Sequence, residues 1–365
     1  MSTPARVRAG CGLSGEETAQ PRHLLPPATR RTLAPELPVA STVRRARRKG
    51  CCGLQRRAAS SPGRNGGVVR KAGTGRRRHG PGGDLLEEHV EKAEPQRRSH
   101  CDAGEPGEGM GGLRERGFAR YGAAQLGIIP AGSAARDLAR IREVFAALPP
   151  DPYAPGTNRF RRYSHAVYLP WKDELSWIPG TPHPVHGTVT DFSQGEDDPE
   201  YPRTRRVLPD IPEALRGNAL LLRLLRWDIE QVLSLKNLGR RPLWAGVHLI
   251  RLGVDRPGQD AVSSPNCLHQ DGGSASTFTF AHLISRTNVT GGQNVIATPG
   301  SAGLQPEDPW ADIHADFTLT DPLDGYAVHD HRVSHYVGPV RAGSEPGPGE
   351  RSILIIGLAP YIPQL

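Results

Sequence analysis

A histidine and an aspartate two residues apart, His269 and Asp271, are the residues whose types and spacing point most directly to chemistry. Side chains alternate between faces in an extended segment, so an imidazole and a carboxylate at this spacing lie side by side. Such a pair can occupy two adjacent corners of a metal ion. An iron site with two histidines and one carboxylate leaves its other positions open for substrate and oxygen. A lone His-x-Asp pair is weak evidence, so this hypothesis needs a second, distant histidine.

Candidates for that histidine lie near the C-terminus, at His329, His331 and His335. All three have odd numbers, so they would share one face of an unbroken strand, and the spacing leaves the choice open. Arg351 follows on an apolar segment, and its planar guanidinium suits a bidentate contact with a carboxylate. Cys267 also lies two residues from His269, but a small buried hydrophobe is the commoner role for a cysteine.

Three arginines occur within four residues at Arg159, Arg161 and Arg162. In an extended segment Arg159 and Arg161 share one face, and Arg162 points to the other. The cluster is either a solvated strand edge or a clamp for a substrate carboxylate. Aromatic residues beside it keep the second interpretation open.

The elements that must position these residues follow from the apolar pattern. Helical periodicity predicts amphipathic helices over residues 136–148 and 211–238. Short apolar strands between turns are then predicted at 245–252, 277–284, 294–298 and 352–358, which favours a mainly β sandwich or jelly roll with flanking helices. Residues 171–201 are predicted to be loop, and the acidic segment Gly300–Asp324 is a candidate lid.

The first third of the chain differs in composition from the rest. Residues 1–109 contain 21 of the 46 Lys and Arg but 11 of the 38 Asp and Glu, a net charge of +10, whereas the remainder carries −2. Every Trp, Tyr and Phe lies after Met110. A segment rich in Arg, Gly and Pro without aromatics cannot bury enough apolar surface to offset the entropy of ordering it. We therefore predict that residues 1–109 are disordered.

Two alternatives concern this basic segment. Met110 is the second of only two methionines and coincides with the change in composition, which favours a natural start at or near Met110 over a true disordered arm. The arginine runs are also compatible with a nucleic-acid-binding arm. They lack interleaved aromatics for stacking on bases, so nucleic acid is not the expected partner.

The remaining composition sets the expected compartment. Four of the five cysteines lie before Met110 at spacings that match no zinc pattern, and Cys267 alone follows it. A single cysteine in the folded part fits a reducing compartment. No apolar run reaches the roughly 20 residues of a membrane span. The sequence predicts a cytoplasmic protein without a membrane partner.

Taken together, several motifs resemble one bacterial enzyme family. The motif beginning at His269 is followed by Arg286-Thr287-Asn288 with Gly291-Gly292, then by residues 330–340 around His335, and finally by Arg351. This combination resembles the 2-oxoglutarate/Fe(II)-dependent dioxygenases that include free L-amino-acid hydroxylases such as isoleucine hydroxylase. The resemblance covers roughly residues 112–358.

The resemblance implies a double-stranded β-helix (jelly roll, cupin-like) over residues 110–365. It assigns Fe(II) to His269, Asp271 and His335, and the distal carboxylate of 2-oxoglutarate to Arg351. The implied reaction uses O2 and 2-oxoglutarate to hydroxylate an unactivated C–H bond of a small molecule, most simply a free L-amino acid. Arg159 and Arg162 are then candidates for the substrate carboxylate, and the acidic segment 300–324 is a candidate for its ammonium group.

Other functions compete with this one. A tailoring oxygenase would act on a peptide or on a carrier-bound residue. A non-enzymatic alternative is a metal-binding jelly roll with a basic nucleic-acid-binding arm, although Arg351 argues against it because a structural metal site needs no anchor for 2-oxoglutarate. Many substrates share one fold, so the residues do not name the substrate, the oxidised carbon or the oligomeric state.

Overall fold

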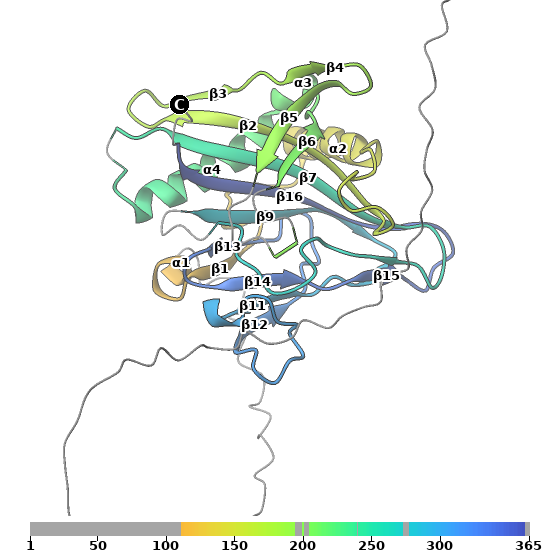
Figure 1. Ribbon diagram of the computed structural model, residues 1–365. Coiled ribbons are helices and arrows are strands. Elements are labelled where there is room, and N and C mark those ends of the chain that lie inside the picture. Colours follow the sequence, from red (N-terminus) through yellow and green to blue (C-terminus); the bar gives the residue numbers. More distant parts are fainter. Residues whose placement is uncertain (1–110, 194–198, 201–203, 239, 273–276, 362–365) are drawn as a thin grey trace, which may run out of the picture. The chain divides into compact units, whose positions relative to one another are not determined.

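The computed structural model describes residues 111–193, 199–200, 204–238, 240–272 and 277–361. Residues 1–109 lie outside the described residues, so their disorder and the start at Met110 stay predictions. All described residues belong to one compact unit, which spans residues 89–365. Figure 1 shows its strands in layers, with helices beside one of them.

Seven antiparallel strands form the main sheet, in the order β1-β13-β9-β16-β7-β2-β3. The two central strands, β7 and β16, are each 12 residues long and pair along their whole length. Long apolar runs suit them because both faces of the sheet are covered. The strands are β1 Phe118–Tyr121, β2 Arg159–Leu169, β3 Glu174–Trp177, β7 Leu243–Val254, β9 Phe278–Thr287, β13 Gly325–His329 and β16 Gly349–Pro360.

Three smaller sheets complete the β structure. The sheet β12-β11-β14 comprises Ile313–Phe317, Asn294–Ala297 and Ser334–Val337. The sheet β10-β15-β8 comprises Val289–Gly291, Val340–Ala342 and Asp260–Ala261, and the sheet β4-β5-β6 comprises Thr181–His183, Gly187–Ser193 and Arg205–Pro209. The first of these lies low in Figure 1 and carries His335.

Two apolar cores lie on opposite faces of the main sheet. On β16, Leu354 and Ile356 belong to the core shared with the helices, whereas Ile353 belongs to the core shared with β11 and β12. This division follows from the alternation of side chains along a strand. The second core joins the main sheet to the smaller sheet, and the cavity described below lies on that side.

The helices cover the other face of the main sheet. They are α1 Gly111–Glu115, α2 Gly132–Ala146, α3 Glu213–Arg216 and α4 Ala219–Leu235. The helix predicted at 136–148 is confirmed as α2, but the single helix predicted over 211–238 is wrong. It is broken at Asn218, whose side chain accepts a hydrogen bond from Leu221 N and so starts α4 afresh. No helix among the described residues is long and apolar enough to cross a membrane.

The predicted loops contain more structure than expected. Residues 171–201 include β3, β4 and β5, because antiparallel pairing with neighbouring strands overrides their Pro- and Gly-rich composition. The segment 300–324 contains the end of the short helix η1 Pro299–Ser301 and the whole of β12. The four predicted strands are confirmed as β7, β9, β11 and β16. The architecture is mainly β with flanking helices, as the apolar pattern indicated.

Candidate metal centre

Backbone pairing brings the two histidines together from segments 66 positions apart in the sequence. His269 forms an isolated antiparallel bridge with His335, and each amide donates to the other residue's carbonyl at 2.9 Å. His335 belongs to β14, which pairs on its other side with β11. The stretch around His269 therefore adds one residue pair to the edge of the smaller sheet. Asp271 follows at the start of the segment that leads to β9.

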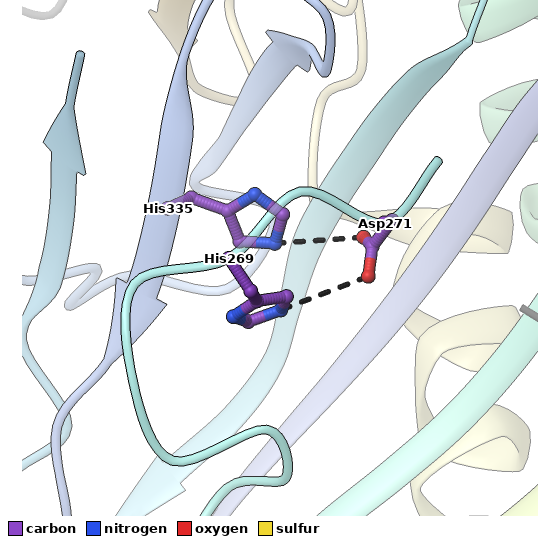
Figure 2. Close-up of side chains that lie close together, drawn as sticks. All are labelled: His269, Asp271 and His335. Atoms are coloured by element: carbon purple, nitrogen blue, oxygen red, sulfur yellow. Dashed lines mark ion pairs between the residues drawn. The ribbon is translucent and has the colours of Figure 1, made fainter. Parts of the chain in front are cut away.

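The side chains of His269, Asp271 and His335 converge on one point (Figure 2). His269 Nε2 lies 3.7 Å from Asp271 Oδ1, and His335 Nε2 lies 3.5 Å from Asp271 Oδ2. One ligand atom from each residue lies within 4.8 Å of the other two. Two imidazoles and a carboxylate at this separation form a donor set that could hold a divalent iron ion with open positions.

The structure separates His335 from the other two candidate histidines. Asp330, His331 and Arg332 form a turn after β13, with Arg332 N donating to His329 O at 2.8 Å, so the assumption of an unbroken strand was wrong. His331 is exposed in this turn. His329 stacks on Phe278, with ring centroids 4.4 Å apart. Neither is in the group of residues that could hold a metal.

A hydrogen bond sets the proton position of His269. Its Nδ1 lies 2.8 Å from the carbonyl oxygen of Cys267. A carbonyl only accepts, so Nδ1 carries the proton and Nε2 presents its lone pair towards Asp271. Cys267 is half-buried, and its backbone rather than its thiol makes this contact.

Burial and charge set the protonation states of His335 and Asp271. Burial lowers the pKa of His335 to about 4, with His269 adding to the effect, so its imidazole is neutral near pH 7. Burial acts to raise the pKa of Asp271, but His335 and His269 outweigh it and the pKa is lowered. A neutral imidazole at His335 beside an ionised carboxylate at Asp271 is the arrangement that metal binding requires.

The lowered pKa of His335 predicts acid sensitivity of the metal-free protein. An unfolded histidine has a pKa of about 6.5, so stability is lost as the pH falls from about 6.5 towards 4, where only the unfolded state takes up the proton. Urea unfolding at pH 7 and pH 5 should show a loss roughly 1–2 kcal/mol smaller in His335→Gln than in the wild type. His331→Gln, in the exposed turn, should show the wild-type loss. Equal losses in all three proteins would contradict this assignment.

A cavity of about 270 Å³ opens beside the three residues. Apolar side chains on its wall include Ile250, Val337 and Ile355. Arg159, Arg161, Arg206 and His248 line it as well. None of its described lining residues comes from the acidic segment 300–324, so the structure does not place that segment where it would meet a substrate's ammonium group.

Two arginines on the cavity wall share one carboxylate. Arg159 Nη1 lies 3.2 Å and Arg161 Nη1 3.9 Å from Asp151 Oδ2, and all three side chains are buried. Burial and the charge of Arg159 together lower the pKa of Arg161 to about 9, although Asp151 opposes both effects. Arg161 thus stays charged near neutral pH. The pair carries one more positive charge than its carboxylate balances.

Arg162 lies on the opposite face of β2 and does not line the cavity. Its Nη1 donates to the carbonyl oxygen of Asp210 at 2.6 Å. The geometry therefore favours Arg161 over Arg162 as the second candidate, beside Arg159, for binding the substrate carboxylate. The alternation of side chains along an extended segment already contained this signal.

His248 is a cavity residue that the sequence analysis did not single out. Arg161 Nη2 donates to its Nδ1 at 2.7 Å, so the ring proton lies on Nε2. Burial and the charges of Arg161, Arg159 and Arg206 hold its pKa well below 6.5, so the ring is neutral. The available signal was that the predicted apolar strand 245–252 contains two polar residues, His248 and Arg251.

Arg351 is fully buried beside the cavity rather than on its lining. It shares a face of β16 with Ile355 by alternation along the strand, and its Nη2 donates to Asn294 Oδ1 at 3.1 Å. Burial lowers its pKa to about 10, and Tyr326, which lines the cavity, interacts with it electrostatically. The guanidinium is therefore charged at neutral pH and close to the cavity wall.

Comparison with known proteins identifies the family of this fold. The family model described as 2OG-Fe dioxygenase matches residues 142–357. The chain belongs to the 2OG-Fe dioxygenase family. Membership confirms the resemblance drawn from the motifs and makes the protein a 2-oxoglutarate/Fe(II)-dependent dioxygenase, an enzyme that uses Fe(II) and 2-oxoglutarate.

Individual proteins are similar to this chain in sequence or in fold. The chain is 29% identical over 223 residues to the 3(1)-hydroxy-L-isoleucine 4-dioxygenase of Pantoea ananatis (strain AJ13355), covering 60% of this chain and 80% of that protein. A bsmA homologue from Methylobium petroleophilum PM1 matches 70% of this chain and 93% of its own, with 19% identity and a TM-score of 0.56. IDO from Bacillus thuringiensis matches 70% and 95%, with 18% identity and a TM-score of 0.52. These structures confirm the jelly-roll fold.

Proposed function

We propose that this dioxygenase hydroxylates an unactivated C–H bond of a free L-amino acid. The observation that carries the proposal is the buried Arg159–Arg161 pair on the cavity wall, which has one positive charge in excess of Asp151. A substrate carboxylate would balance that charge through charge-assisted hydrogen bonds. The Pantoea ananatis relative, by its name a dioxygenase of a hydroxy-L-isoleucine, supports an amino acid as the substrate class.

We further propose that His269, Asp271 and His335 hold Fe(II). The donor set fits, because both Nε2 atoms face the carboxylate and the His269 tautomer leaves its Nε2 without a proton. Bound iron with 2-oxoglutarate supplies the activation of O2 and the C–H oxidation, for which side chains have no chemistry of their own. The protein binds the substrate, orients it and excludes water from the cavity.

Arg351 is the proposed partner of the distal carboxylate of 2-oxoglutarate. Its guanidinium is buried and charged, and Asn294 holds one of its nitrogens. The other donors of the planar fork suit a bidentate contact with a carboxylate. In this proposal the two carboxylates bind to different arginines. The co-substrate contacts Arg351, and the substrate contacts Arg159 and Arg161.

His248 extends the proposed carboxylate site. Its Nε2–H is a neutral donor beside the Arg161 guanidinium, and its ring lines the cavity. Ile250, Val337 and Ile355 offer apolar surface to the rest of the substrate. A cavity lined by these charged and apolar side chains fits the carboxylate and the apolar body of an aliphatic amino acid.

The test is a substrate screen with the full chain. Protein purified without O2 is loaded with Fe(II) and 2-oxoglutarate and then exposed to O2 with each of the twenty L-amino acids. We expect one or a few aliphatic amino acids to stimulate succinate formation and to gain one oxygen atom by mass spectrometry. If iron and 2-oxoglutarate bind but no amino acid is oxidised, the free amino acid is the wrong substrate class, and a peptide or carrier-bound residue replaces it.

Two neighbouring arginines provide matched variants for the same assay. Arg161→Gln removes a proposed substrate contact and should raise the KM for the amino acid about 10- to 100-fold, the effect of losing one charged hydrogen bond. Arg162→Gln alters the opposite face of β2 and should leave that KM unchanged. The KM for 2-oxoglutarate should stay the same in both variants. Equal effects at the two positions would contradict the proposed carboxylate site.

A further inference from the structure

The two histidines of the centre differ in what faces their outer ring nitrogen. His269 Nδ1 has the carbonyl oxygen of Cys267 as its acceptor. His335 Nδ1 is buried without a hydrogen-bond partner among the described residues, and so is Asp330 Oδ1. These two atoms lie 4.0 Å apart. A buried donor and a buried acceptor that face each other at this distance form an incomplete hydrogen bond.

Metal binding gives this pair a definite role. An imidazole that binds a metal through Nε2 carries its proton on Nδ1, and that N–H usually donates to a carboxylate or carbonyl that fixes the ring. A ring rotation that shortens the distance by about 1 Å would complete the bond. Asp330 Oδ1 can accept the bond whether or not Oδ2 carries a proton. The contact therefore does not depend on the charge of Asp330.

The other oxygen of Asp330 reaches a second residue of the centre. Thr279 Oγ1 lies 3.0 Å from Asp330 Oδ2 and 3.2 Å from Asp271 Oδ2. Asp330 thus connects to Asp271 through one hydroxyl and faces His335 directly.

The backbone holds Asp330 in place for these contacts. Its amide donates to Thr277 O at 3.2 Å, and its carbonyl oxygen accepts a hydrogen bond from the Gln270 side chain. Gln270 lies between the two proposed ligands His269 and Asp271. The turn after β13 is in this way tied to the ligand-bearing segment, and the Asp330 side chain is completely buried.

We propose that Asp330 is a positioning residue of the metal centre, which orients His335 through Nδ1–H and Asp271 through the hydroxyl of Thr279. The inference rests on the proposed iron site. It adds a carboxylate that binds no metal itself but determines how tightly the three ligands hold it.

Metal affinity of the full chain tests this role without any turnover. Co(II) is titrated in the absence of O2 into the wild type, Asp330→Leu and Asp228→Leu. Asp228 is the matched control, because it is equally buried and lies 2.9 Å from His282, away from the metal centre. We expect Asp330→Leu to bind Co(II) about 10- to 100-fold more weakly, as is usual when a partner of a metal-bound histidine is removed, and Asp228→Leu to bind it like the wild type.

A second measurement covers the case that Asp330→Leu does not fold. In the Co(II) protein the exchangeable Nδ1–H protons of His269 and His335 give two strongly shifted NMR resonances. Asp330→Ala removes both carboxylate oxygens and should shift one of them and leave the other, whereas Asp228→Ala should shift neither. Unchanged resonances in Asp330→Ala, or unchanged Co(II) affinity in folded Asp330→Leu, would overturn the inference.

These outcomes separate the inference from the iron site on which it rests. If the wild type binds no Co(II), or if Asp271→Ala binds it as tightly as the wild type, the proposed iron site fails and the role of Asp330 fails with it. If Asp271→Ala loses Co(II) and folded Asp330→Leu does not, only the positioning role is wrong.

Discussion

Replacement of Asp271 by alanine should abolish Fe(II) binding and lower succinate formation at least about 10³-fold. The carboxylate is the only anionic member of the proposed donor set, and both imidazole Nε2 atoms lie within 3.7 Å of it. Without its charge, a divalent cation would lie in a buried site with two neutral ligands. Anaerobic Fe(II) titration and single-turnover succinate measurement test the two losses separately.

His331→Ala is the matched control for this experiment. The His331 side chain is exposed in the turn after β13, only four residues from His335, so its removal should change neither Fe(II) affinity nor turnover. Asp271→Ala protein that still forms succinate at a rate near the wild type would show that iron is held elsewhere. Loss of iron in His331→Ala but not in His335→Ala would reverse the choice of histidine.

Replacement of Arg351 by methionine should weaken 2-oxoglutarate binding about 10²-fold, while Fe(II) affinity stays unchanged. Methionine keeps an unbranched apolar stem of similar length but removes the guanidinium. The co-substrate's distal carboxylate would then be buried without a cation, which costs far more than loss of an exposed contact. Titration of 2-oxoglutarate into the iron-loaded protein gives the affinity directly.

Arg251→Met is a suitable control for Arg351→Met. Arg251 lies on β7, the strand beside β16, and its guanidinium stacks on Phe160 at 4.0 Å from the ring centroid rather than facing the cavity. Its replacement should leave the 2-oxoglutarate affinity as it is. An unchanged affinity in Arg351→Met would exclude Arg351 as the anchor and direct attention to the cavity arginines Arg159 and Arg161.

Local sequence patterns were enough for the general architecture and for part of the centre. Alternating and continuous apolar runs identified four strands of the jelly roll, because the period of side chains along a strand is a local property. The two-residue spacing of His269 and Asp271 placed both side chains on one side of the backbone for the same reason. The motif pattern as a whole was specific enough to identify the dioxygenase family.

Helix breaks and irregular strands were harder to predict from the sequence. The apolar face of residues 211–238 continues across Asn218, so periodicity alone could not show that its side chain caps a new helix. Residues 171–201 form strands only because neighbouring strands accept their backbone hydrogen bonds. Their partners are adjacent in the chain, as in the pair of Leu169 with Glu174, but the turn geometry and side-chain packing that select this pairing are not encoded in local composition.

The amino-acid sequence by itself determined the fold class, the His-x-Asp pair and the family of the enzyme. Residue spacing left His329, His331 and His335 equivalent, and the family resemblance selected His335. The tertiary structure gives the physical reason, because the turn at 330–332 breaks the strand and leaves His331 exposed. It also placed Arg161 rather than Arg162 on the cavity wall, and it brought Asp330 within reach of two proposed ligands. These outcomes depend on turns and strand registers that bring separate segments of the chain together. The spacing of residues along the sequence does not predict which of those segments come into contact.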